Sequence, residues 1–188
     1  MSDTDLIRSA RSGDPAAWEA ILTEHYQPVF RLAYLIVGDP DDADDVAQEA
    51  FIRAHRYFRR YDETRPLRPW LFSIAANLAR NRRRSLGRYY AAVRRLFRQR
   101  ETQTKPGIEA RMAARLESHR LWQAVRQLPE DDQNVIYLRF FLELPVKEAA
   151  ETLDVAPGTV KSRLSRALER LRTVIGDQYP DLEAEFLQ

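Results

Sequence analysis

Apolar residues recur at steps of three and four through most of this 188-residue chain, and this spacing constrains the fold more than any other feature. A helix of 3.6 residues per turn places such residues on one face, where they can pack together. No segment shows the sustained apolar–polar alternation of a half-buried strand. The sequence therefore predicts an all-α fold, and the length allows one ordinary domain or two small ones.

Three helices are expected in the first half of the chain. In order, they are predicted over residues 14–37, over residues 41–60 and, starting at Leu67 or Trp70, as far as about Ser85. Gly38-Asp39-Pro40 is expected to end the first helix. The two prolines within residues 61–69 predict a loop before the third.

The helical pattern breaks at Leu86-Gly87 and resumes from about Ile108. Between these points the composition is basic, then polar, and suits a flexible linker that is partly helical. Pro129 interrupts the pattern again, and Gly176 is expected to close the second domain. The predicted division is a first domain, a linker, a second domain and an acidic tail, over residues 1–86, 87–112, 113–175 and 176–188.

Charge is segregated along the chain although its net value is only +2. Residues 1–50 carry −8 and residues 51–100 carry +13, while the rest is close to neutral. Since like charges in one block repel, this indicates an anionic partner for the middle of the chain and a cationic one for its beginning. Of 30 basic residues 27 are Arg, which favours contacts with phosphates and bases, although a GC-rich genome is an alternative source of that ratio.

Several functional classes are excluded by what the sequence lacks. Without cysteine there are no disulfides, zinc ribbons, thiolate catalysis or iron–sulfur clusters. The longest apolar run, residues 32–37, is too short to span a bilayer, and the first residues are acidic where a secretory signal is basic. No Gly-rich phosphate loop, nucleophile elbow or Ser/His/Asp spacing appears. We therefore expect a cytoplasmic protein that is not an enzyme, with no cofactor and no metal.

Residues 145–171 have the lengths of a helix-turn-helix, with small residues at Ala149-Ala150 and a tight connection at residues 154–156. Apolar residues are predicted to face inward at Val160, Leu164, Ala167 and Leu171. Hydroxyl and cationic side chains would then point outward near the start of the second helix, at Thr159, Lys161, Ser162, Arg163, Ser165 and Arg166. Such donors suit base edges and phosphates. The alternative is a solvated helix of an ordinary bundle.

Two further patterns lie in the first half. On the third helix, amides and guanidiniums share one stripe at Asn77, Arg80, Asn81 and Arg84. Such a stripe can bind bases and phosphates. The aromatic rings of Tyr57, Tyr61 and Trp70 lie nearby in the sequence and could stack on unpaired bases, although Tyr57 and Trp70 are expected in the core.

The second pattern is acidic and lies on the second helix, where exposed side chains are expected at Asp44, Asp45, Gln48 and Glu49. These carboxylates cannot all converge on one metal ion, so helix capping and a cationic protein partner are the preferred interpretations.

Four signatures in order resemble the extracytoplasmic-function sigma factors of bacterial RNA polymerase, across roughly residues 14–172. They are Asp-Ala-Asp-Asp-Val-Ala-Gln-Glu-Ala-Phe, Pro-Trp-Leu-Phe-Ser-Ile-Ala-Ala-Asn, Leu-Pro and Gly-Thr-Val-Lys-Ser-Arg-Leu-Ser-Arg-Ala, at residues 42–51, 69–77, 128–129 and 158–167. The resemblance implies two helical domains, regions 2 and 4, joined by a linker. It also implies a specificity subunit that leaves catalysis to the polymerase.

The resemblance assigns roles to three sets of residues. The second helix would dock on the clamp helices of the largest polymerase subunit through Asp45, Gln48 and Glu49. The loop and third helix would capture an unstacked base and open the minus-10 element through Tyr61, Asn77, Arg80, Asn81 and Arg84. The helices before the helix-turn-helix would contact the polymerase flap, and its second helix would read the minus-35 duplex through Thr159, Lys161, Ser162, Arg163 and Arg166. The linker, residues 88–107, would thread toward the RNA exit channel.

The sequence departs from the family in one place and leaves other functions open. The family commonly has Asp where Asn81 stands, so its promoter preference cannot simply be carried over. Many members are held by an anti-sigma protein, which is a further candidate partner. The alternatives are a free-standing helix-turn-helix regulator, which would leave the first domain without a purpose, and a metal-dependent nucleic-acid enzyme built on residues 41–49.

Overall fold

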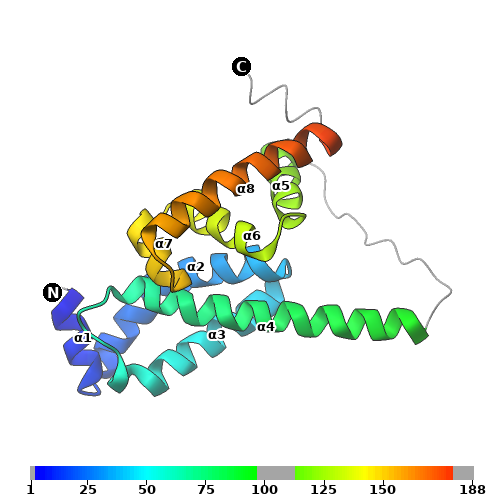
Figure 1. Ribbon diagram of the computed structural model, residues 1–188. Helices are drawn as coiled ribbons and strands as arrows, with labels where there is room; N and C mark the ends of the chain where they lie inside the picture. The colour runs from blue at the N-terminus through cyan, green and yellow to red at the C-terminus, as the bar shows by residue number, and fades with distance from the viewer. Residues whose placement is uncertain (1–2, 97–112, 180–188) are drawn as a thin grey trace.

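Figure 1 shows the computed structural model of the chain, which describes residues 3–96 and 113–179. Every regular element in these two segments is a helix, which confirms the predicted all-α class. In chain order they are α1 (Asp3–Arg11), α2 (Pro15–Val37), α3 (Pro40–Tyr57), the 3₁₀ turn η1 (Phe58–Arg60), α4 (Leu67–Leu96), α5 (Ala113–Arg126), α6 (Glu130–Ile136), the π-helical turn η2 (Tyr137–Phe141), α7 (Val146–Leu153) and α8 (Pro157–Gln178). Within these two segments, no helix is long and apolar enough to cross a membrane.

The ends of α2 lie where the sequence predicts them, and each has a local cause. Asp14 caps the N-terminus by accepting from the Ala16 N–H at 3.0 Å, and Pro15 occupies the first helical position. The Ser9 hydroxyl donates to the same carboxylate at 2.7 Å, and these bonds lower the pKa of Asp14. At the other end Gly38 adopts a φ of +85° and donates its N–H to the Tyr34 carbonyl at 2.8 Å.

Helix α3 begins in the same way, since Asp39 accepts from the Asp41 and Asp42 N–H groups at 3.0 Å each. The predicted helix over residues 41–60 is present, but its last turn is the 3₁₀ turn η1. Helix α4 begins at Leu67, the earlier of the two predicted starts, because a proline in the first turn removes no intrahelical hydrogen bond.

The predicted end of the third helix near Ser85 is wrong, because α4 continues through Gly87 to Leu96. One glycine weakens a helix by only about 1 kcal/mol relative to Ala, and the Ala, Arg and Leu residues that follow are good helix formers. Helix α8 likewise continues through Gly176 and ends at Gln178. Helix α1 was not predicted, because its sequence carries no strong helical signal. The rest of the predicted linker, residues 97–112, and residues 180–188 of the tail lie outside the described residues.

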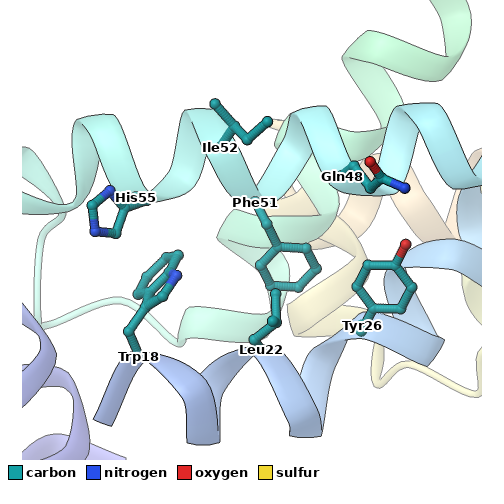
Figure 2. A pocket seen from close by; sticks show the side chains of 7 residues that line it. All are labelled: Trp18, Leu22, Tyr26, Gln48, Phe51, Ile52 and His55. Atoms are coloured by element: carbon teal, nitrogen blue, oxygen red, sulfur yellow. The ribbon is translucent and has the colours of Figure 1, made fainter. Parts of the chain in front are cut away.

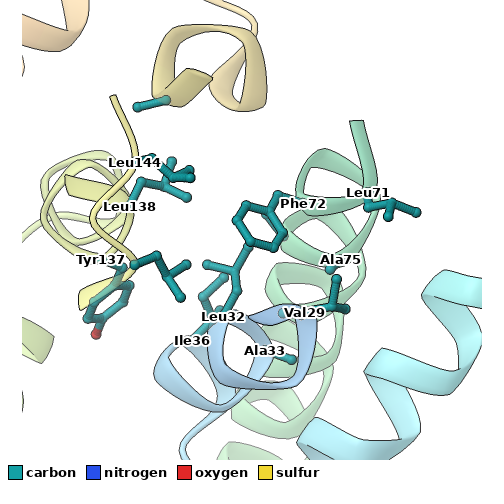
Figure 3. Close-up of a cluster of buried hydrophobic side chains, with 14 of the residues drawn as sticks. Val29, Leu32, Ala33, Ile36, Leu71, Phe72, Ala75, Tyr137, Leu138 and Leu144 are labelled. Atoms are coloured by element: carbon teal, nitrogen blue, oxygen red, sulfur yellow. The ribbon is translucent and has the colours of Figure 1, made fainter. Parts of the chain in front are cut away.

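The helices form two groups that share one apolar core. Helices α2, α3 and α4 pack on one another, and α5, α6, α7 and α8 form the second group, which lies along α2 and α4 (Figure 1). Figure 3 shows the contact between the groups, where side chains of α2 and α4 face η2 and the segment after it. The residues concerned are all fully buried or nearly so: Leu32, Ile36, Phe72, Tyr137, Leu138 and Leu144.

Truncating Phe72 should therefore destabilise both groups together. Phe72 is 0% exposed, and Phe72→Ala is expected to lower the free energy of unfolding by about 3–5 kcal/mol. The matched control is Phe140→Ala on η2, where the ring is 56% exposed and a change of about 0.5 kcal/mol or less is expected. Urea denaturation measures both values, and equal losses in the two variants would contradict the described core.

Candidate nucleic-acid and partner interfaces

The predicted stripe of amides and guanidiniums lies along one face of α4. Asn77, Asn81 and Arg84 are exposed, and Arg80 is half-buried. The Arg80 guanidinium donates to the Asn77 side-chain oxygen and, through Nε, to the Ala76 carbonyl at 3.2 Å. These bonds hold Arg80 along its own helix, so the stripe presents one ordered cationic and polar surface.

The aromatic residues beside this stripe are placed differently from the predictions. Tyr61 is 4% exposed, packs against the rings of Phe58 and Trp70 at centroid distances of 5.6 and 4.8 Å, and donates its hydroxyl to the Arg65 carbonyl. It therefore offers no free face for a base in this arrangement. Trp70 is partly buried as expected, but Tyr57, the last residue of α3, is 47% exposed rather than in the core.

Three arginines on or beside the stripe contact the start of α6. The Arg84 guanidinium lies 3.2 Å and Arg80 Nε 3.8 Å from the Glu130 carboxylate, while Arg83 donates to the Gln133 side-chain oxygen at 2.7 Å. Gln133 is buried and is fixed by its own bond to the Leu128 carbonyl at 2.6 Å. These contacts between residues about fifty positions apart leave no trace in the sequence pattern.

The acidic residues of α3 form a face with internal partners. Asp45 lies 3.2 Å from the Arg82 guanidinium, and the hydrogen bond and charge of Asp42 raise the pKa of that arginine. Glu49 pairs with Arg53 at 2.7 Å, and Gln48 donates to Asp44 at 2.7 Å. The predicted trio of Asp45, Gln48 and Glu49 thus lies together on the outer side of α3, next to its own counter-ions.

A groove between α2 and α3 adjoins this acidic face and was missed in the sequence. Its volume is about 540 Å³, and Figure 2 shows mainly apolar and aromatic side chains lining it: Trp18, Leu22, Tyr26, Gln48, Phe51, Ile52 and His55. Ile52 is 54% exposed, and an exposed isoleucine on the polar face of α3 was the available sequence signal. Burial, together with a 2.6 Å hydrogen bond to Asp44, raises the pKa of Tyr26 to about 12.

Helices α7 and α8 form the predicted helix-turn-helix. Asp154 turns the chain in the left-handed conformation, with a φ of +54°, and the Val155 N–H donates to the Ala150 carbonyl at 3.0 Å. The inward set on α8 is confirmed, since Val160, Ala167 and Leu171 are buried and Leu164 is half-buried.

The outward set on α8 is less uniform than predicted. Lys161, Ser162, Ser165 and Arg166 are exposed, whereas Thr159 and Arg163 are half-buried. The Arg166 Nε donates to the Ser162 carbonyl at 3.2 Å, and Arg163 lies 3.3 Å from the Asp131 carboxylate of α6. The leading end of α8 therefore presents cations and hydroxyls, one of which already has an acidic neighbour.

Among the residues that the structure describes, no group of three or more His, Asp or Glu side chains is arranged to hold a metal ion. The structure instead has two separate cationic and polar surfaces, on α4 and α8, and one apolar groove beside the carboxylates of α3. A helix-turn-helix together with a second cationic surface in one all-α chain is typical of a protein that binds DNA.

Comparison with known proteins gives the same class. The model for sigma-70 region 2 matches residues 21–89, and the model for sigma-70 region 4 matches residues 118–171. The ECF RNA polymerase sigma factor SigW of Bacillus subtilis is 32% identical over 91% of this chain and 95% of its own. The RNA polymerase sigma-H factor of Pseudomonas aeruginosa is 30% identical over 90% and 91%. The structure of CnrH in complex with the cytosolic domain of CnrY is similar with a TM-score of 0.71 and 27% identity, covering 94% of this chain and 98% of CnrH.

The chain belongs to the extracytoplasmic-function group of the sigma-70 family of RNA polymerase sigma factors. Its function is that of the family, promoter-specific initiation of transcription.

The buried tyrosines give a pH dependence that tests this packing. Burial raises the pKa of Tyr26, Tyr61 and Tyr137 to about 12, whereas an unfolded tyrosine ionises near pH ~10. Above pH ~10 the unfolded chain loses protons that the folded chain keeps, so the free energy of unfolding falls as the pH rises to about 12. Urea denaturation at stepped pH measures this fall, and Tyr61→Phe should reduce its slope by about a third. An unchanged slope in that variant would contradict the burial of Tyr61.

Proposed function

We propose that the two groups of helices divide the promoter between them. Helix α4 binds the minus-10 element and the α7–α8 unit binds the minus-35 element, while α3 attaches the chain to core RNA polymerase. The observation that carries this proposal is the ordered stripe of Asn77, Arg80, Asn81 and Arg84 along one face of α4. The protein acts as a specificity subunit in the cytoplasm, and the polymerase supplies the chemistry.

The attachment to polymerase uses charge and shape together. Asp45, Gln48 and Glu49 offer acidic and polar groups to a basic partner, which we assign to the clamp helices of the largest subunit. The adjoining groove, with Ile52 exposed at its edge, accepts an apolar side chain of the same partner. Arg82 and Arg53 are released from these carboxylates when the partner's own cations replace them. The flap of the polymerase contacts the helices before the helix-turn-helix.

At the minus-10 element, the amides of Asn77 and Asn81 contact base edges, and Arg80 and Arg84 hold phosphates or stack on bases. Melting follows from trapping an unstacked base, and each stacked base contributes about 1–3 kcal/mol. The loop between η1 and α4 borders this surface, and Tyr61 becomes available only when that loop moves, because its ring is buried. Asn81 adds a donor where the family commonly has a carboxylate, so the base preference at its contact differs.

At the minus-35 element, the start of α8 enters the major groove of duplex DNA. Lys161, Ser162 and Arg166 are exposed there, and Thr159 and Arg163 lie at the edge of the same surface. Apart from promoter and polymerase, an anti-sigma protein is a proposed partner. A related complex supports this, since CnrH was solved with the cytosolic domain of CnrY.

The test of this function is transcription with purified components. Adding the protein to bacterial core RNA polymerase and a genomic promoter pool should produce run-off transcripts whose start sites share two spaced upstream elements. Core polymerase alone is the control and should not produce them. Absence of these transcripts together with no comigration with core polymerase would contradict the proposal and favour a free-standing regulator.

Arg163 provides a second test, because a base contact and a phosphate contact differ in their consequences. Arg163→Ala should weaken binding to the preferred minus-35 duplex by about 1–3 kcal/mol and relax the sequence preference at one position. Arg172→Ala, an exposed arginine farther along α8, is the matched control and should leave sequence preference unchanged. Fluorescence anisotropy with duplexes of varied sequence measures both. An equal loss for every sequence, with a shallower salt dependence, would make Arg163 a phosphate contact instead.

A further inference from the structure

The start of α6 lies beside one flank of α8 (Figure 1), and two consecutive carboxylates make the polar contact. Asp132 is buried, with a side chain only 6% exposed, and accepts a hydrogen bond from the Arg170 guanidinium. Asp131 is 64% exposed, and its Oδ2 lies 3.3 Å from Nη1 of Arg163. Arg163 and Arg170 are about two helical turns apart, so they lie on the same flank of α8. This flank is therefore joined to α6 at two points.

The two ion pairs have different consequences. Asp132 is a fixed point between α6 and α8, because a buried carboxylate that loses its partner is strongly destabilising. The pair of Asp131 with Arg163 is open to solvent on the Asp131 side, and such pairs contribute little to the free energy of unfolding. Its effect is on direction, since a carboxylate beside one nitrogen restricts where a long and flexible guanidinium side chain points.

Direction matters at Arg163 because this residue lies between the buried and the outward faces of α8. On one side of it around the helix, Val160 and Ala167 are buried. On the other side, Ser162 and Arg166 are exposed, and Arg163 itself has 27% of its side chain exposed. A guanidinium carries five N–H donors, and the contact with Asp131 is made through Nη1, so further donors remain for a base edge.

We propose that Asp131 is a positioning residue for sequence recognition: it holds the Arg163 guanidinium in the direction that reads one base of the minus-35 duplex. The inference rests on the proposed function, because it takes α8 as the minus-35 surface and Arg163 as a base contact. A guanidinium held in this way donates two parallel hydrogen bonds to O6 and N7 of a guanine, the base whose major-groove edge fits such a fork. A guanidinium without the carboxylate loses more conformational entropy on binding and contacts neighbouring phosphates as well.

The charge of Asp131 acts against its positioning effect, and this separates the two. A carboxylate near DNA repels phosphates, so its removal leaves the affinity for unselected sequences unchanged or slightly higher. Removal of a carboxylate that only stabilises the fold would instead lower the affinity for every sequence. Sequence preference and overall affinity therefore respond differently only if Asp131 acts through Arg163.

The experiment measures binding of minus-35 duplexes by the chain in complex with core RNA polymerase. The duplexes carry the upstream element shared by the run-off start sites, with each of the four base pairs in turn at the position where Arg163→Ala relaxes the preference. Asp131→Asn should reduce the ratio of affinities for the preferred and the other base pairs about threefold to tenfold. The affinity for the other base pairs should change by about twofold or less. Fluorescence anisotropy measures all four affinities.

Three further variants show whether Asp131 acts through Arg163. Asp131→Glu keeps the carboxylate and should keep most of the preference. Glu169→Gln is the matched control, because it removes the same charge from an exposed position on α8, and it should leave the ratio unchanged. In an Arg163→Ala background, Asp131→Asn should have no further effect on the ratio, because the two residues act as one unit.

The outcomes separate this inference from the proposed function. A ratio that Asp131→Asn leaves unchanged, or lowers equally with and without Arg163, would overturn the inference. An equal loss of affinity for all four duplexes, or the absence of any position at which Arg163→Ala relaxes the preference, would also overturn it. In each of these cases a wild-type complex that prefers one duplex still supports the proposed function. A wild-type complex without any preference among duplexes would contradict the proposed function and this inference with it.

Discussion

The apolar contact of α2 and α4 with η2 is the interaction on which the rest of the structure depends. Phe72 on α4, with Leu32 on α2, is buried against Leu138 and Leu144, so one continuous core serves both groups of helices. This contact fixes how α4 lies against α6. It thereby determines which arginines of residues 51–100 meet carboxylates of the second group and which remain exposed.

The charge segregation seen in the sequence is balanced within the folded chain. Arg82 pairs with Asp42 and Asp45, and Arg84 pairs with Glu130. In each case an internal carboxylate stands where a phosphate or a partner's carboxylate could bind. Because these pairs lie at the surface and are individually weak, they can be exchanged for external partners at little loss of free energy. The same residues therefore stabilise the free chain and stay available for the contacts proposed with polymerase and promoter.

The sequence predicted what local rules control. Capping at Asp14 and the left-handed glycine at Gly38 define α2, and the inward positions of α8 follow from helical periodicity. The extension of α4 beyond Gly87 was missed because a single glycine is a weak breaker. The burial of Tyr61, the groove beside Ile52 and the contact of α4 with α6 depend on tertiary packing between distant segments. Periodicity assigns residues to a face but does not say which faces meet.

The measurement that tests this account most directly is the structure of the chain bound to core polymerase and promoter DNA. The account predicts that α4 and its stripe lie on an unstacked minus-10 base and that the start of α8 lies in the major groove at the minus-35 element. A complex in which α4 makes no contact with DNA, or in which the start of α8 lies outside the major groove, would contradict it.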